Sequence, residues 1–152
     1  MTPQEKGKES IVEHIKKDHR KTEDEIAELE KRVKGGKRAE DPVFVPMKKE
    51  LLGHLGAEQE LLFPLLEQEM KKEIEDALKD HDEIRSYLDK LTTGGDMPED
   101  EWARLLKEMK KEIQEHTAEE EGKILPGAQR ILGEEKLIEL GSKFEETEEK
   151  YS

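Results

Sequence analysis

The sequence contains one set of metal-ligand side chains twice, at a constant offset of 62 positions. In each copy a histidine is followed 35 residues later by a second histidine, then after four more residues by a glutamate, and a proline lies ten residues beyond the second histidine. Imidazole nitrogens and carboxylate oxygens are common metal ligands, so the duplication indicates an internal repeat built around metal binding. The copies comprise His19, His54, Glu58 and Pro64, and His81, His116, Glu120 and Pro126, with Asp18 and Asp80 preceding the leading histidines.

Apolar residues at three- and four-residue spacing predict that these side chains lie on helices. Ser10 and Glu13 form a capping box that predicts the start of the first helix. Pro64 predicts a kink or local break near Phe63 in the second helix. The expected limits are Ser10 to Gly35-Gly36 for the first helix, Asp41-Pro42 onward for the second, about Lys71 to Gly94-Gly95 for the third, and Asp96 or Met97 to Pro126, which closes or kinks the fourth.

A last amphipathic segment follows Gly133 and carries Leu137, Leu140 and Phe144. We expect it to form a short fifth helix that packs across the end of the other four, with its final residues frayed. Four long helices with short connections predict an all-α fold, an antiparallel up-down four-helix bundle.

All six histidines and glutamates of the repeat fall in helix seams where periodicity calls for leucine or isoleucine. Burying so many polar groups without partners costs several kcal/mol each, on the order of 2–7 kcal/mol. No inward-facing set of lysines or arginines is available to compensate two glutamates, whereas one or two cations would satisfy all six residues. The ligand count favours two metals about 3.5–4 Å apart. The repeat pairs His19 with His54 and His81 with His116, with Glu58 and Glu120 as bridges; iron or manganese suits these donors, and zinc and copper are alternatives.

Composition narrows the functional class. Charged residues make up 44% of the 152 residues and the net charge is -13, which disfavours nucleic acid or an anionic membrane as a partner. The absence of cysteine excludes a disulfide framework, a thiolate site or an iron–sulfur cluster. Neither a signal peptide nor a long apolar run is evident, so a soluble cytoplasmic protein is the expectation. Glu-x-x-His and His-Glu-x-x-His motifs are also missing, which disfavours ferritin-like di-iron proteins and zincin proteases.

The spaced pattern as a whole resembles the hemerythrin-like HHE cation-binding domain. The resemblance rests on Asp18-His19, on His54 through Pro64, on Asp80-His81 and on His116 through Pro126. It implies a single domain over residues 1–152, with the bundle at about 10–126 and a helical extension at about 127–150. It further implies a non-haem di-iron centre, oxo- or hydroxo-bridged, whose metal ligands are His19, His54, Glu58, His81, His116 and Glu120.

The sequence departs from the oxygen-carrying members of this family at one place. Those proteins have a second histidine one turn from the histidine of the third helix, whereas the neighbours of His81 at four residues are Ala77 and Arg85. One iron then lacks its third imidazole, which leaves an open or water-filled position and disfavours simple oxygen carriage.

Several further residues are candidates for a role near the metal site. His14 has no histidine at the repeat offset and is expected at the boundary or beside a ligand. Glu23 and Arg85 are equivalent positions that either form an ion pair over the site or belong to a solvated face. Tyr87 either donates to a ligand or packs at the rim. Asp18 and Asp80 either orient ligand histidines or face solvent, and solvent exposure is favoured because they lie about 100° round the helix from the histidines.

Three functions are compatible with the pattern. The first is a di-iron protein that binds or senses a small ligand such as oxygen, peroxide or nitric oxide. The second is a redox enzyme that breaks down peroxide or carries out an oxygen-dependent oxidation at the same site. The third is iron storage or structural metal binding. No protein partner can be named from the sequence.

Overall fold

In the computed structural model, which describes residues 9–33 and 41–152, all regular structure is helical, as the sequence predicts. The expected end of the first helix at Gly35-Gly36 lies outside the described residues. No helix in the described ranges is long and apolar enough to cross a membrane. The elements are α2 (Ile11–Val33), α3 (Phe44–Ala57), η1 (Glu58–Leu62), α4 (Phe63–Leu66), α5 (Lys71–Thr93), α6 (Glu99–Glu119), η2 (Glu120–Ile124), α7 (Leu125–Leu132) and α8 (Glu134–Tyr151).

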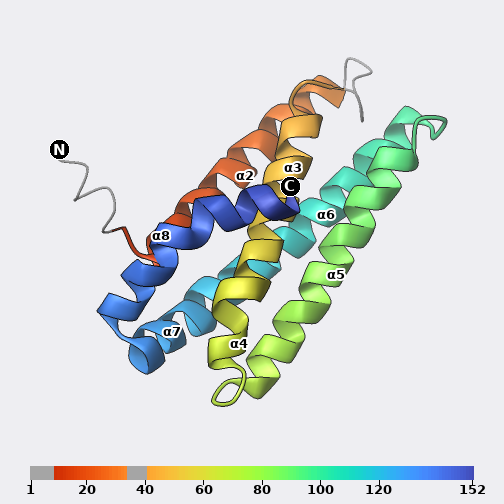
Figure 1. The fold of residues 1–152 in the computed structure, drawn as a ribbon. Coiled ribbons are helices and arrows are strands. Elements are labelled where there is room, and N and C mark those ends of the chain that lie inside the picture. The colour runs from red at the N-terminus through yellow and green to blue at the C-terminus, as the bar shows by residue number, and fades with distance from the viewer. Residues whose placement is uncertain (1–8, 34–40) are drawn as a thin grey trace.

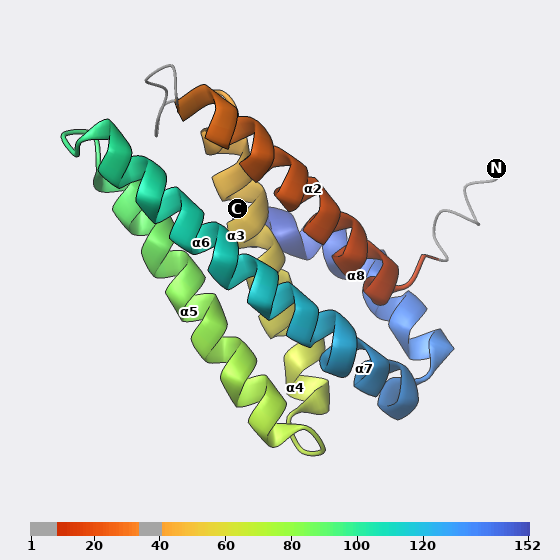
Figure 2. The ribbon, with the colours of Figure 1, turned by 180° about the vertical axis from the view of Figure 1, so that it is seen from behind.

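Four long rods make up most of the molecule. Figures 1 and 2 show α2 beside α3 and α6, with α5 beside α6 on the other side. The rod that begins with α3 continues through η1 and α4, and the rod that begins with α6 continues through η2 and α7. Each copy of the sequence repeat therefore supplies one uninterrupted helix, α2 or α5, and one rod that contains a π-helical turn.

The starts of α2 and α3 involve the predicted residues Ser10 and Asp41, whereas α6 begins later than predicted and without a side-chain cap. The Ser10 hydroxyl accepts a hydrogen bond from the Glu13 N–H at 3.3 Å, and α2 begins at Ile11. The Asp41 carboxylate accepts from the Val43 N–H at 2.7 Å, so α3 begins at Phe44, two residues later than a start at Pro42. The limits of α5 match the prediction, and α6 begins at Glu99, directly after Pro98.

The kinks predicted from the prolines are π turns. Pro64 has no N–H to donate and its ring crowds the preceding turn, so the helix widens before it. The Phe63 N–H donates to the carbonyl of Glu58, five residues back, and Leu125 does the same to Glu120. Each π turn thus begins at one of the two glutamates of the repeat.

The C-terminal helix differs from the expectation in length and place. It has 18 residues and extends to Tyr151. It lies along α3 and α2, on the face away from α5, instead of across the end of the bundle (Figures 1 and 2). Its last turn is held rather than frayed, because Lys150 and Tyr151 both donate to the Glu60 carboxylate, at 2.8 and 2.6 Å.

Two glycines on α3 explain why α8 packs there. A Cβ at Gly53 would meet the Glu148 carbonyl oxygen at 2.6 Å, and one at Gly56 would overlap the Tyr151 ring. The missing side chains therefore let the backbones of α3 and α8 approach closely. At its other end, α8 is set off from α7 by Gly133, whose φ of 80° suits glycine.

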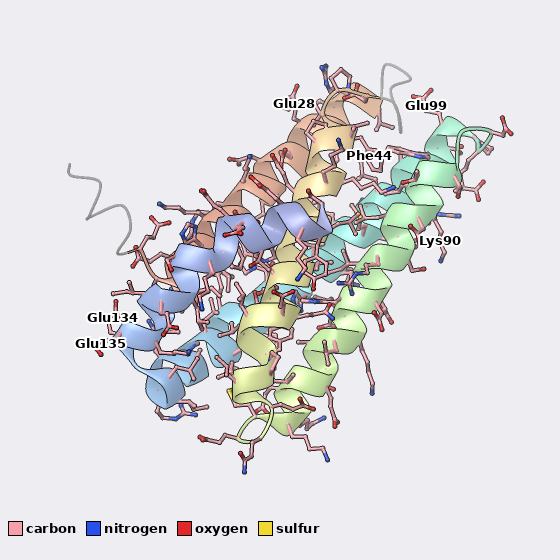
Figure 3. All side chains as sticks on the ribbon, viewed as in Figure 1. Glu28, Phe44, Lys90, Glu99, Glu134 and Glu135 are labelled. Atoms are coloured by element: carbon pink, nitrogen blue, oxygen red, sulfur yellow. The ribbon has the colours of Figure 1, made fainter. Side chains whose placement is uncertain are left out.

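The apolar core is divided into two clusters with a polar layer between them. One cluster contains Ile15, Ala77 and Ile124, and the other contains Ile26, Ile84 and Ile113, together with the fully buried Trp102. Charged side chains such as Lys90, Glu99, Glu134 and Glu135, labelled in Figure 3, are exposed on the outside. Each rod carries one histidine of the repeat, and this histidine lies between a residue of one cluster and a residue of the other.

Candidate metal centre

The four repeat histidines point their Nε2 atoms at the two repeat glutamates. His19 Nε2 lies 2.9 Å from a Glu120 oxygen, and His116 Nε2 lies 3.6 Å from the other oxygen of that carboxylate. His54 Nε2 and His81 Nε2 each lie 3.3 Å from Glu58 Oε1. All six side chains are buried, and both glutamates have no exposed surface at all.

These donors form two overlapping groups, each compact enough to hold one cation. His19 and His54 belong to one group and His81 and His116 to the other, and both groups contain Glu58 and Glu120. Within a group, the ligand atoms lie within 4.8 Å of one another. This is the pairing that the repeat predicts, with the two carboxylates placed where they would be shared by two ions.

The residues present fit a pair of metal ions. Seven buried atoms at the centre make no hydrogen bond to any described residue: Nε2 of His54, His81 and His116, and all four carboxylate oxygens of Glu58 and Glu120. An unsatisfied buried polar atom costs about 1–3 kcal/mol, so proteins rarely retain such a cluster without a partner. Imidazole nitrogen and carboxylate oxygen are both good donors to first-row divalent metals.

Each histidine is also held from behind through Nδ1. His54 Nδ1 lies 2.9 Å from the Asp18 carboxylate and His116 Nδ1 lies 3.1 Å from Asp80. Of the two roles considered for these aspartates, the favoured one, solvent exposure, is wrong because it considered only their own helix, and the alternative, orienting ligand histidines, agrees with the structure. About 100° from the leading histidine, each is partly buried and reaches the histidine of the following rod. A carboxylate only accepts, so Nδ1 carries a proton and Nε2 is the nitrogen left to bind a cation.

The residues directly after the two glutamates hold the other two histidines, and the sequence analysis missed both. His19 Nδ1 lies 2.7 Å from Glu121, and His81 Nδ1 lies 2.9 Å from the Gln59 amide oxygen. Gln59 and Glu121 are equivalent in the repeat, so applying the offset of 62 to the residues beside the ligands would have found them.

Arg85 reaches the centre by a route that was not expected. It donates to the Gln59 amide oxygen at 2.7 Å and lies 3.4 Å from Asp82. Glu23 instead borders a hollow of about 290 Å³ beside His19 and Glu121, so the hypothesis of an ion pair between Glu23 and Arg85 finds no support in the described contacts.

The C-terminal helix contributes to the same site. Burial and a hydrogen bond to Asp18 raise the pKa of Glu148 to about 9, so this carboxyl keeps its proton at neutral pH and donates to Asp18. Phe144 packs edge-on against His54, with ring centroids 5.8 Å apart, and also stacks on His14 at 5.7 Å. His14 therefore lies at the boundary, as expected, and Tyr87 packs against the core cluster that contains Trp102, a rim role.

Burial and charge set the protonation of the metal-free centre. Burial and the charge of Glu120 raise the pKa of Glu58 to about 8. Burial also raises the pKa of Glu120, but hydrogen bonds from His19 and Glu58 and the charges of His116 and His19 together outweigh it and leave that pKa well below its usual value. Burial and the charge of His116 lower the pKa of His81 well below its usual value, whereas Glu120 holds the pKa of His19 above its usual value in spite of burial.

Residues 10–128 match the family model described as the hemerythrin HHE cation binding domain. The chain belongs to this family. The matched segment contains both copies of the repeat and all six converging residues, so an HHE domain with a buried histidine and glutamate cluster able to bind metal is established. Comparison with curated proteins and with solved structures gave no match.

Proposed function

We propose that this HHE protein binds two iron ions in an antiparallel up-down four-helix bundle of the hemerythrin type, and that it binds or senses a small ligand there. His19 and His54 would hold one ion, His81 and His116 the other, and Glu58 and Glu120 would bridge them. The observation that carries this proposal is the overlap of two donor groups through the same two carboxylates. A bridge of this kind is typical of paired-metal sites.

The surroundings of the donors favour a small ligand over an organic substrate. The hollow beside His19 has a volume of about 290 Å³ and the one beside His54 and Asp18 about 220 Å³. Pockets that take drug-sized molecules have volumes of roughly 300–1,000 Å³, so the hollow beside His54 lies below this range and the one beside His19 lies at its lower limit. Nitrogen and oxygen donors without thiolate suit iron or manganese.

The side chain one turn before His81 supports a role in which the site senses a small ligand over simple reversible carriage of oxygen. Ala77 is buried in the core cluster that contains Ile15, so no third imidazole is available there. Bound iron would supply a Lewis-acidic, redox-active cation with a position open to a small ligand. The chain itself orients the imidazoles through their Nδ1 atoms and excludes bulk water with two apolar clusters, and Glu58 would release its proton to solvent when a cation binds.

The test is an anaerobic spectroscopic titration of protein loaded with iron(II). Oxygen, hydrogen peroxide and nitric oxide are added separately, and the ultraviolet–visible spectrum is followed. Saturable spectral changes that are lost in Glu58→Gln support the proposal. Continuous turnover of peroxide would instead indicate a redox enzyme. Mineral growth beyond two irons per chain would indicate iron storage, and an unchanged spectrum would indicate a structural metal site.

A further inference from the structure

The residues that contact the histidine Nδ1 atoms form two pairs related by the repeat, and in one of these pairs the two residues differ. Asp18 and Asp80 hold His54 and His116 alike, but His19 is held by a carboxylate, Glu121, where His81 is held by an amide, Gln59. The amide oxygen also accepts from Arg85, whose equivalent in the first copy is Glu23.

We propose that Arg85 and Gln59 act as positioning residues that make the two metal positions unequal, so that the position of His81 and His116 fills second and binds its cation more weakly. This inference rests on the proposed two-metal site and adds which position is the labile one.

Arg85 first determines which way the amide faces. Guanidinium groups only donate, so the oxygen of Gln59, not its nitrogen, must face Arg85 at 2.7 Å. The same oxygen lies 2.9 Å from His81 Nδ1, which must therefore carry the ring proton and leave the Nε2 lone pair pointing at the centre. Without Arg85 the amide can turn its NH₂ group toward Nδ1, which favours the tautomer with a proton on Nε2 and blocks ligation. A carboxylate such as Glu121 has no such second orientation.

Charge then separates the two positions. The position of His19 and His54 has two carboxylates behind its imidazoles, Glu121 and Asp18. The position of His81 and His116 has one carboxylate, Asp80, and a neutral amide backed by a cation. The side chains of Glu121, Asp18, Asp80 and Arg85 are 29%, 30%, 33% and 32% exposed, so solvent screens the charges behind the two positions to a similar extent. Carboxylates behind a ligand histidine increase its basicity, and losing such a partner costs about 10–100-fold in metal affinity.

The experiment is a titration of metal-free protein with Zn²⁺, a diamagnetic probe, followed by the side-chain nitrogen spectra of the individual histidines. In the wild type, His19 and His54 are expected to respond before His81 and His116, with dissociation constants about 10–100-fold apart. Gln59→Glu supplies the carboxylate that the first copy has and is expected to bring the two steps together. Glu121→Gln is the matched change at the other position and is expected to weaken the first step. Zn²⁺ filling both positions together in the wild type, or an unchanged gap in Gln59→Glu, overturns the inference.

A second readout needs no metal. The tautomer of His81 can be read from its two side-chain nitrogen shifts, because Nδ1 faces the Gln59 amide oxygen at 2.9 Å. The wild type and Arg85→Lys, which keeps a donor-only cation, are expected to show the proton on Nδ1, whereas Arg85→Met is expected to show a mixture. The same tautomer in all three overturns the role of Arg85. If the tautomers behave as expected but Zn²⁺ does not reach the histidines, the two-metal site itself is refuted.

Discussion

Removing the metal is expected to destabilise the fold strongly, because the centre is costly when nothing is bound. Seven buried atoms of His54, His81, His116, Glu58 and Glu120 have no hydrogen-bond partner among the described residues. At about 1 kcal/mol for each atom that stays without a partner, the lower limit for such groups, the cost is a large part of the about 5–15 kcal/mol of net stability of an ordinary domain.

The size of the effect follows from binding linkage. At a free metal concentration about 100 times the dissociation constant, each bound ion stabilises the folded state by about 2.7 kcal/mol. For a chain of about this length, 1 kcal/mol shifts Tm by about 2–4 °C, so each ion is expected to raise Tm by about 5–11 °C and two ions by about twice that.

The assay is thermal unfolding followed by circular dichroism, with a chelator and then with increasing Zn²⁺ or anaerobic iron(II). Glu58→Gln removes a carboxylate shared by both donor groups and is expected to lose most of the increase in Tm. Glu30→Gln is the matched control, since Glu30 pairs with Lys110 at 2.9 Å and lies on α2, about 16 Å along the helix from His19. An equal Tm with chelator and with saturating metal, or an equal increase in both variants, would refute the reasoning.

Three further predictions concern protons and packing. The pKa of Glu58 is raised to about 8, and the neighbouring carboxylates hold the pKa values of His19 and His54 above their usual value in spite of burial. Metal binding at about pH 7 is therefore expected to release roughly one proton from Glu58, in addition to protons from the two histidines, and an indicator dye in weakly buffered solution measures the release. No release at this pH would contradict the assignment. Burial and Glu50 raise the pKa of Glu25 to about 7, so the stability that protonated Glu25 contributes is present below the unfolded pKa of 4.5 and is lost as pH rises through 7. Glu25→Gln is therefore expected to stabilise the protein at about pH 8 but not at about pH 4, as measured by urea unfolding. Gly56→Val is expected to push the last turn of α8 off α3 and to cost about 1–3 kcal/mol, with faster hydrogen exchange around residues 145–151, whereas an unchanged exchange pattern would show that the close approach is not required.

The sequence predicted the inner part of the centre because the repeat constrains it twice. Six polar residues in apolar seams, at one offset, leave few arrangements other than convergence, and the structure brings all six together. The prolines likewise predicted where the rods depart from regular helix, although not that the departure is a π turn that begins at Glu58 and at Glu120.

The residues behind the histidines were harder to predict, because helical periodicity places a side chain only relative to its own axis. Asp18 lies well round the helix from His19 and looked exposed, yet that direction faces His54 on the neighbouring rod. The place of α8 was not predictable from its apolar stripe, which says that one face is buried but not what covers it. The missing signal was on α3, where Gly53 and Gly56 leave room for another backbone.

The most direct test of the two-metal site is the number of irons per chain, measured together with the ultraviolet–visible spectrum, in the wild type and in Glu58→Ala and Glu120→Ala. Because both carboxylates belong to both donor groups, we expect about two irons per chain in the wild type, as in paired-metal sites, and loss of iron and of the near-ultraviolet bands in both variants. A wild-type protein that takes up no iron, or variants that keep its full iron content and spectrum, would contradict the account.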